Sequence, residues 1–242
     1  MQEGDVQIKG YPIRLPLDVA IVFSANPEDY TARGKIITPL KDRIGSEIRT
    51  HYPATVEEGI EITAQEAWIN RSAKAANGNG DGAQLRVPKY INEIIERIAF
   101  AAREDKKVDK RSGVSQRLPI SAIENVVSNA ERRAISHEEK LIVPRVSDIY
   151  AALPAITGKL ELEYEGEMKG ADHVSRELIR TAVAKSFDTH LHGVNMNQVV
   201  QWFDLGGEIQ LSDNAGAAEV LQGLTQIQGL MDKLVKLNVG PK

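Results

Sequence analysis

The pattern of apolar residues changes near residue 54, from short continuous runs to helical spacing. Residues 19–23 read Val-Ala-Ile-Val-Phe without alternation, which is typical of a strand buried on both faces of a parallel sheet. Residues 6–8 and 48–51 are two further strand candidates, bounded by glycine and proline. We therefore expect an α/β region over residues 1–53.

From residue 54 onward the pattern predicts helices. Thr55 and Glu58 stand at the spacing of a capping box, so we expect a helix to begin there. Pro88 precedes a second helix, in which apolar residues recur every three or four positions as far as Ala102. The polar run after it, residues 103–111, is interpreted as a solvated turn. A third helix is expected from Arg117, with an apolar face of Ile120, Ile123, Val126, Val127 and Ala130.

The last hundred residues give a weaker signal. Residues 160–165 alternate apolar and acidic side chains, which favours a half-exposed strand and leaves a helix as the alternative. Apolar stripes predict helices over residues 174–187 and 215–237. We expect residues 146–242 to form a mainly helical extension.

Composition excludes several classes of protein. The 242 residues are 42% hydrophobic, enough for one to three compact units. There is no cysteine, which excludes disulfides and thiolate metal sites and suits a cytoplasmic protein. No apolar run approaches the ~20 residues of a membrane span, and no secretory signal is evident. With 30 basic and 34 acidic residues, the net charge of −4 argues against a nucleic-acid partner.

Three segments carry a resemblance to a known family. Residues 21–30 read IVFSANPEDY, residues 37–53 read ITPLKDRIGSEIRTHYP, and residues 113–135 read GVSQRLPISAIENVVSNAERRAI. In this order they resemble the sensor-1 strand, the arginine-finger segment and the sensor-2 helix of AAA+ ATPases of the magnesium-chelatase subunit I and MoxR type. The resemblance covers roughly the first 145 residues.

The resemblance implies roles for three residues. Asn26 matches sensor 1 and would orient the attacking water. Arg43 matches the arginine finger, which acts on the γ-phosphate of a neighbouring subunit, and Arg117 matches the sensor-2 arginine, which contacts the γ-phosphate in its own subunit. Local reasoning leaves alternatives: Asn26 as a cap to the following turn, Arg33 or Arg49 as the finger, and Arg117 as a plain surface arginine.

Two motifs of such ATPases are not found. No stretch fits the phosphate loop G-x-x-x-x-G-K-[ST], and no apolar run ends in the acidic pair that would hold Mg²⁺. We therefore expect Met1 to correspond to an internal position of a longer protein, or to the start of a truncated reading frame. The implied fold is the C-terminal part of an αβα core over residues 1–53, a helical lid over 54–145 and a mostly helical extension over 146–242.

Two functions follow from this interpretation. In the first, the chain is the sensor and lid portion of a homo-oligomeric ring, which uses ATP and Mg²⁺ in its full-length context for remodelling or metal insertion. The resemblance then also implies a partner with a von Willebrand A domain. In the second, the chain is a non-catalytic oligomerisation or interaction module derived from such a protein.

Two other features are weaker candidates for a site. Residues 76–82 (Ala-Asn-Gly-Asn-Gly-Asp-Gly) could form a phosphate-binding nest, but no strand precedes them, which favours an exposed loop. His190 and His192 could turn both rings toward a metal. Nothing at suitable spacing completes the ligand set, so no metal site is expected.

Overall fold

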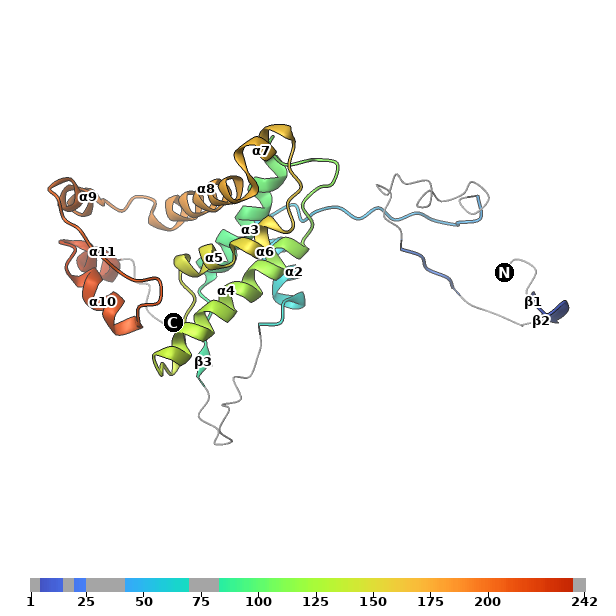
Figure 1. The fold of residues 1–242 in the computed structure, drawn as a ribbon, viewed down its shortest axis with the longest axis horizontal. Coiled ribbons are helices and arrows are strands. Elements are labelled where there is room, and N and C mark those ends of the chain that lie inside the picture. The colour runs from blue at the N-terminus through green and yellow to red at the C-terminus, as the bar shows by residue number, and fades with distance from the viewer. Residues whose placement is uncertain (1–4, 15–19, 25–41, 70–82, 237–242) are drawn as a thin grey trace. The chain divides into compact units, whose positions relative to one another are not determined.

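The computed structural model describes residues 5–14, 20–24, 42–69 and 83–236 (Figure 1). The chain divides into two compact units, residues 1–49 and residues 50–242. Most of the described residues are helical, and no helix among them is long and apolar enough to cross a lipid bilayer.

The regular structure described in residues 1–49 is a two-stranded hairpin. Strands β1 (Asp5–Ile8) and β2 (Tyr11–Arg14) pair antiparallel, with Ile8 opposite Tyr11 at the turn. The turn residues Lys9 and Gly10 both have positive φ, 50° and 85°. This is the backbone that a two-residue type I′ hairpin turn requires, and glycine adopts it without steric cost.

The predicted buried strand over residues 19–23 is wrong for the residues described. Residues 20–24 form no strand, and Val22 is 90% exposed. The predicted strand over residues 48–51 is also wrong, since this stretch has no regular structure and Ile48 is 89% exposed. A run of β-branched residues becomes a buried strand only where other elements cover both its faces. In the described part of residues 1–49, the one sheet is the small hairpin.

The helical unit begins as predicted. Helix α2 (Val56–Glu66) starts after Thr55, whose side-chain oxygen accepts a hydrogen bond from the Glu58 backbone N–H at 3.2 Å. The Glu58 carboxylate in turn accepts from the N–H of Ala54 at 2.7 Å. These two bonds satisfy backbone donors that the first helical turn leaves without a partner.

Helices α3 (Lys89–Glu104), α4 (Arg117–Ser136) and α8 (Ala171–Leu191) build the main core, with α3 packed against both of the others (Figure 1). The apolar stripe predicted for α3 is buried throughout. Three short helices complete this core: α5 (Val146–Ala151), α6 (Leu153–Thr157) and α7 (Tyr164–Lys169). One continuous apolar cluster joins residues from both sides of position 145, where the sequence predicts a domain boundary.

A short parallel strand pair lies at one end of α4. Strand β3 (Gln84–Leu85) pairs with β4 (Leu141–Ile142), and Ile142 packs with Ala130 and Ala134 of α4 in a small second cluster. The pair therefore fixes the chain before α3 to the chain after α4.

Two predictions for the C-terminal hundred residues need correction. Residues 160–165 form no strand beyond one bridge between Leu162 and Val108, and helix α7 begins at Tyr164. The single helix expected over residues 215–237 is instead two helices, α10 (Ala217–Thr225) and α11 (Leu230–Lys236). Gly229 between them has φ = 81°, which a continuous helix cannot contain. Helix α9 (Asn197–Asp204) precedes them, and the predicted helix over 174–187 is confirmed as part of α8.

A buried ion pair joins α4 to α5. Arg133 binds the Asp148 carboxylate through Nη1 and donates from Nη2 to the Val143 carbonyl at 2.9 Å. Asn129 and the backbone N–H of Arg145 also donate to Asp148, at 2.7 and 2.6 Å. Asp148 is fully buried, and its carboxylate is satisfied by donors from three directions. A buried charge is tolerated only when it is paired and hydrogen-bonded in this way.

We expect Arg133→Met to destabilise the helical unit by about 3 kcal/mol, because it leaves the Asp148 carboxylate buried without its cation. The measurement is the free energy of unfolding in urea. Arg176→Ala, an exposed arginine on α8, is the matched control and should change stability by less than about 0.5 kcal/mol. Equal effects of the two substitutions would show that the buried pair contributes nothing specific.

Candidate functional site

The structure places the three predicted site residues differently. Asn26 lies outside the described residues. Arg43 lies in a turn of the unit formed by residues 1–49, and its side chain is exposed. Arg117 is the first residue of α4 in the other unit and is also exposed. Since the two arginines belong to separate units, the structure assigns no distance between them.

Arg117 sits at the positive end of a 20-residue helix. Among the described residues, its side chain makes no hydrogen bond or ion pair. An arginine at this end is mildly unfavourable unless an anion is nearby, because the helix dipole places a positive partial charge there. The position is therefore suited to an anionic ligand and is not explained by a contact within the described chain.

The residue before Arg117 is anchored in the core. The side-chain amide nitrogen of Gln116 lies 3.0 and 2.8 Å from the two carboxylate oxygens of Glu96 on α3. It also lies 3.2 Å from the carbonyl of Gly59 on α2. Gln116 therefore joins three helices at the position where α4 begins, and the first turn of α4 has a fixed place in the unit.

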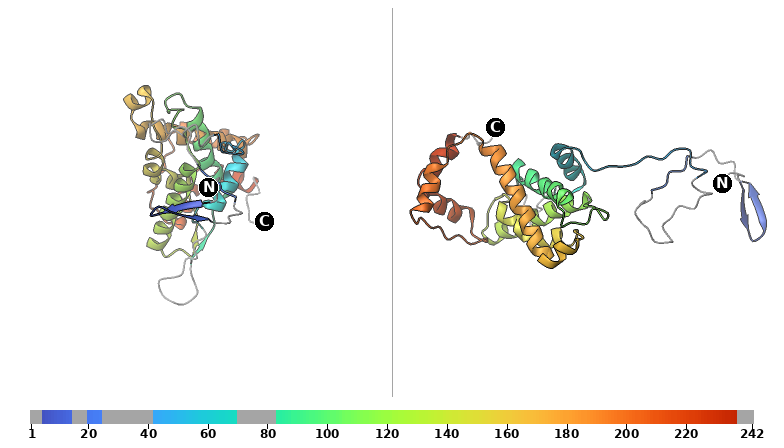
Figure 2. Two further views of the ribbon diagram at one scale, coloured as in Figure 1. Left: turned by 90° about the vertical axis from the view of Figure 1, so that its right-hand side faces the viewer. Right: turned by 90° about the horizontal axis from the view of Figure 1, so that it is seen from above.

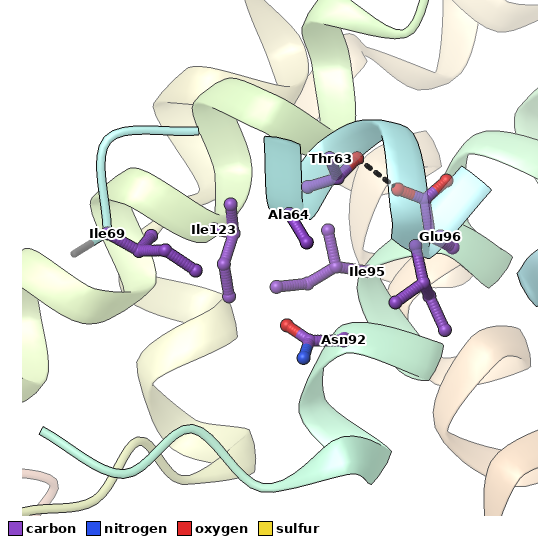
Figure 3. A pocket seen from close by; sticks show the side chains of 8 residues that line it. Thr63, Ala64, Ile69, Asn92, Ile95, Glu96 and Ile123 are labelled. Carbon is purple, nitrogen blue, oxygen red and sulfur yellow. Dashed lines mark hydrogen bonds between the residues drawn. The ribbon is translucent and has the colours of Figure 1, made fainter. Parts of the chain in front are cut away.

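Glu96 is the centre of this network and is 1% exposed. The Thr63 hydroxyl donates to it as well, so the groups that contact its oxygens are donors (Figure 3). Burial raises the pKa of Glu96 above its ordinary value, and the bonds from Thr63 and Gln116 and the charge of Arg103 oppose that rise.

Helix α2 approaches the carboxylate closely because position 59 has no side chain. A Cβ at Gly59 would lie 2.5 Å from Glu96 Oε2. A glycine within a helix costs about 1 kcal/mol relative to alanine. Here that cost is offset by the room it leaves for the buried carboxylate.

Arg103 completes the network at the end of α3. Its Nε donates to the Val114 carbonyl at 2.9 Å, and its Nη2 donates to Gln116 Oε1 at 3.0 Å. The guanidinium carbon lies 4.3 Å from the centre of the Tyr52 ring, which is a cation–π contact. Burial lowers the pKa of Arg103, but a guanidinium keeps its charge at any physiological pH.

The predicted solvated turn over residues 103–111 is therefore only partly correct. Arg103 is half-buried and bonded to the core, and Val108 is buried. The network itself was missed at the sequence level. Helical spacing gives no signal for it, because Glu93 and Glu96 lie away from the apolar stripe of α3, on a face where carboxylates are ordinarily solvated.

A small cavity borders this network (Figure 3). It encloses about 20 Å³ and is lined by Ile60, Thr63, Ala64, Ile69, Asn92, Ile95, Glu96 and Ile123. This is room for about one water molecule, which the Glu96 and Asn92 side chains could bind. It has no room for a nucleotide. A larger, open hollow elsewhere in this unit is bordered by charges of both signs, from Lys106, Lys110, Arg111, Asp109, Glu163 and Glu165.

The histidines considered as metal ligands have other surroundings. His190 Nε2 lies 2.6 Å from the Glu93 carboxylate, and His192 is the residue that ends α8. Among the described residues, no group of three or more histidine, cysteine, aspartate or glutamate side chains could hold a metal ion. Residues 76–82, the other candidate for a ligand site, lie outside the described residues.

Comparison with models of known protein families, with curated proteins and with solved structures gives no match for this chain.

We expect Glu96 to give the helical unit a distinctive dependence of stability on pH. Because its pKa is raised on folding, its protonation favours the folded state. That contribution is complete below the ordinary value of 4.5 and is lost as the pH rises through the raised pKa. The free energy of unfolding of the wild type, minus that of Glu96→Gln, should therefore decrease as the pH rises from about 4.

The measurement is urea unfolding of both proteins over a series of pH values. Glu104→Gln, on the exposed face of the same helix, is the control for a lost surface carboxylate. A difference between wild type and Glu96→Gln that stays constant, or grows with pH, would contradict the raised pKa.

Proposed function

We propose that this chain is the sensor and lid portion of a ring-forming AAA+ ATPase that resembles magnesium-chelatase subunit I. In this role it couples ATP hydrolysis to remodelling or metal insertion. The observation that carries the proposal is the position of Arg117: an exposed arginine opens a long helix whose preceding residue is anchored in the core.

The chemistry of that position supports a phosphate contact. The contact would come chiefly from the guanidinium, because in the first turn the Leu118 N–H already bonds to the Ser115 carbonyl and Pro119 has no N–H. A guanidinium offers a planar set of donors that matches phosphate oxygens. Gln116 and Glu96 hold the start of α4 in place. A phosphate bound by Arg117 would therefore act on the whole helical unit and not on one flexible side chain.

In the proposal, Arg43 is the arginine finger that acts on the nucleotide of a neighbouring subunit. Its side chain is exposed on the unit formed by residues 1–49 and follows Asp42 in the D-R-I-G sequence that resembles the arginine-finger segment. A guanidinium delivered to the nucleotide of a neighbouring subunit neutralises charge that builds up on the γ-phosphoryl oxygens, which is worth roughly 10³ to 10⁵ in turnover.

The described residues fit only part of an ATP site. Arg117 suits a phosphate, but the part of the chain that the structure describes offers neither a metal-ligand cluster nor a nucleotide-sized enclosed cavity. When bound, ATP with Mg²⁺ supplies the phosphoanhydride bond whose hydrolysis drives the ring. Other residues must hold the base and the metal, in keeping with a full-length protein that works in the cytoplasm beside a partner with a von Willebrand A domain.

A specific observation favours the second candidate, a non-catalytic interaction module. Ile21, Val22, Phe23 and Ile48 are large apolar residues exposed on the unit formed by residues 1–49. Several such residues on one small unit are typical of a surface that another chain covers.

The DNA upstream of the Met1 codon distinguishes the two functions. An in-frame G-x-x-x-x-G-K-[ST] motif is expected under the proposal. A stop codon with a ribosome-binding site immediately upstream would contradict it and favour the interaction module.

The 242-residue chain by itself should bind ATP weakly and show no turnover above background. Stoichiometric, Mg²⁺-dependent ATP hydrolysis by the purified chain would contradict the expectation that other residues hold the base and the metal.

In the full-length protein, Arg43→Ala should abolish hydrolysis and leave nucleotide binding nearly intact, because the finger acts chiefly on the transition state. Arg117→Ala should instead weaken the coupling of nucleotide binding to movement of the helical unit. Arg176→Ala, an exposed arginine on α8, is the matched control and should leave both properties unchanged.

Mixing two kinds of inactive subunit tests whether Arg43 acts on a neighbouring subunit. Arg43→Ala subunits are combined with subunits that carry an inactive phosphate site and an intact Arg43. Partial activity should return, because some interfaces pair an intact finger with an intact phosphate site. No activity at any mixing ratio would contradict action between subunits.

A further inference from the structure

The C-terminal segment, residues 197–236, is held on the helical core through the backbone just before α10. Arg145 Nη1 donates to the Ala215 carbonyl at 2.8 Å, and His137 Nε2 lies 2.6 Å from the Asn214 carbonyl. The N–H of Ala217 donates to Glu139 Oε1 at 2.5 Å. Three side chains of the core thus bind main-chain groups of Asn214, Ala215 and Ala217, within residues 214–217.

The site selects small residues. Ala215 is 2% exposed, so its methyl group is enclosed where the segment meets the core. A Cβ at Gly216 would lie 3.1 Å from His137 Nδ1 and 3.4 Å from Glu139 Oε1, which is closer than most side chains pack. A segment with the sequence Asn-Ala-Gly-Ala fits, and one with larger residues at the two central positions does not.

The charges of the site suit the segment as well. Ala217 is the first residue of α10, and its N–H is among those that the first helical turn leaves unpaired. Glu139 satisfies that N–H with a carboxylate at the positive end of the helix. The Arg145 guanidinium donates to a backbone carbonyl, so the site satisfies both a donor and an acceptor of the segment's main chain.

The side chains of His137, Glu139 and Arg145 belong to a part of the core that further hydrogen bonds hold in place. His137 directly follows α4, and its backbone N–H bonds to the Arg133 carbonyl at 3.2 Å. The backbone N–H of Arg145 bonds to the buried Asp148 carboxylate. These bonds do not involve residues 214–217. The site can therefore keep its form when the segment leaves it.

The rest of the segment is loosely held. Helix α9 buries none of its residues, and the main helix packed against α10 is α11 (Figure 2). Large apolar residues are exposed along all three helices: Val200, Phe203, Leu205, Leu221, Met231 and Leu234. The link to α8 includes Gly193 with φ = 79°, a backbone that marks a bend between the two helices.

We propose that the site formed by His137, Glu139 and Arg145 binds residues 214–217 of a second copy of this chain, so that two chains exchange their segments α9–α11. The contacts within one chain and between two chains are the same, so exchange costs little beyond the association itself. This inference is independent of the proposed function.

The test uses two variants of the full chain, each with one half of the contact damaged. Ala215→Glu places a charged side chain in the enclosed position and disables the segment, while the site stays intact. Glu139→Ala combined with Arg145→Ala disables the site, while the segment stays intact. Each variant alone lacks a matched pair and should be monomeric by native mass spectrometry.

An equal mixture of the two variants contains one intact site and one intact segment. The expected result is a heterodimer in the mixture, absent from either variant alone. Absence of the heterodimer, while hydrogen exchange shows residues 215–225 released in both variants, overturns the proposal.

If a variant fails to fold, chemical cross-linking provides a second test of the exchange. The chain has no cysteine, so Ser136→Cys with Asp213→Cys supplies a unique pair of exposed positions, each next to the contact, for a short bismaleimide cross-linker. Cross-linked dimers whose fraction rises with protein concentration support exchange. Cross-linked monomers alone, at every concentration, overturn it.

Discussion

The buried carboxylate of Glu96 is the constraint on which the helical unit depends. A charge removed from water must be met by donors, and here these come from Thr63 on α2 and from Gln116 at the start of α4. Apolar packing alone would let α2 slide along α3, because packing is not directional. The carboxylate fixes one position, and the missing side chain at Gly59 makes that position reachable.

The sequence predicts those helices that have a strong periodic pattern and local signals at their ends. Thr55 caps α2 as expected, Pro88 precedes α3, and Arg117 is the first residue of α4. These features depend on neighbours within one turn of the chain. The strands predicted at residues 19–23 and 48–51 fail because a strand depends on partners distant in sequence, and the described part of residues 1–49 provides only a hairpin. Gly229 breaks the last predicted helix through its backbone conformation, which apolar spacing does not reveal.

The candidate site likewise has some features that the local sequence predicts and others that depend on residues distant along the chain. The position of Arg117 at a helix start follows from the local pattern and from the family resemblance. The anchoring of Gln116 beside it does not, because its partners lie 20 and 57 residues away along the chain. The role proposed for Arg43 would depend on a neighbouring subunit, and Asn26 lies outside the described residues. The contact between residues 214–217 and the core was also beyond prediction, since small residues in a loop carry no pattern.

The stacking of Tyr52 on Arg103 has a mechanical consequence. Tyr52 lies three residues after the boundary between the two units, and its ring rests on a guanidinium that bonds to both Val114 and Gln116. Gly113 makes this possible, because a Cβ there would lie 2.2 Å from the Tyr52 hydroxyl. Tension applied to the linker at residues 50–52 therefore passes through two contacts into the first turn of α4, and it bypasses the whole length of α2.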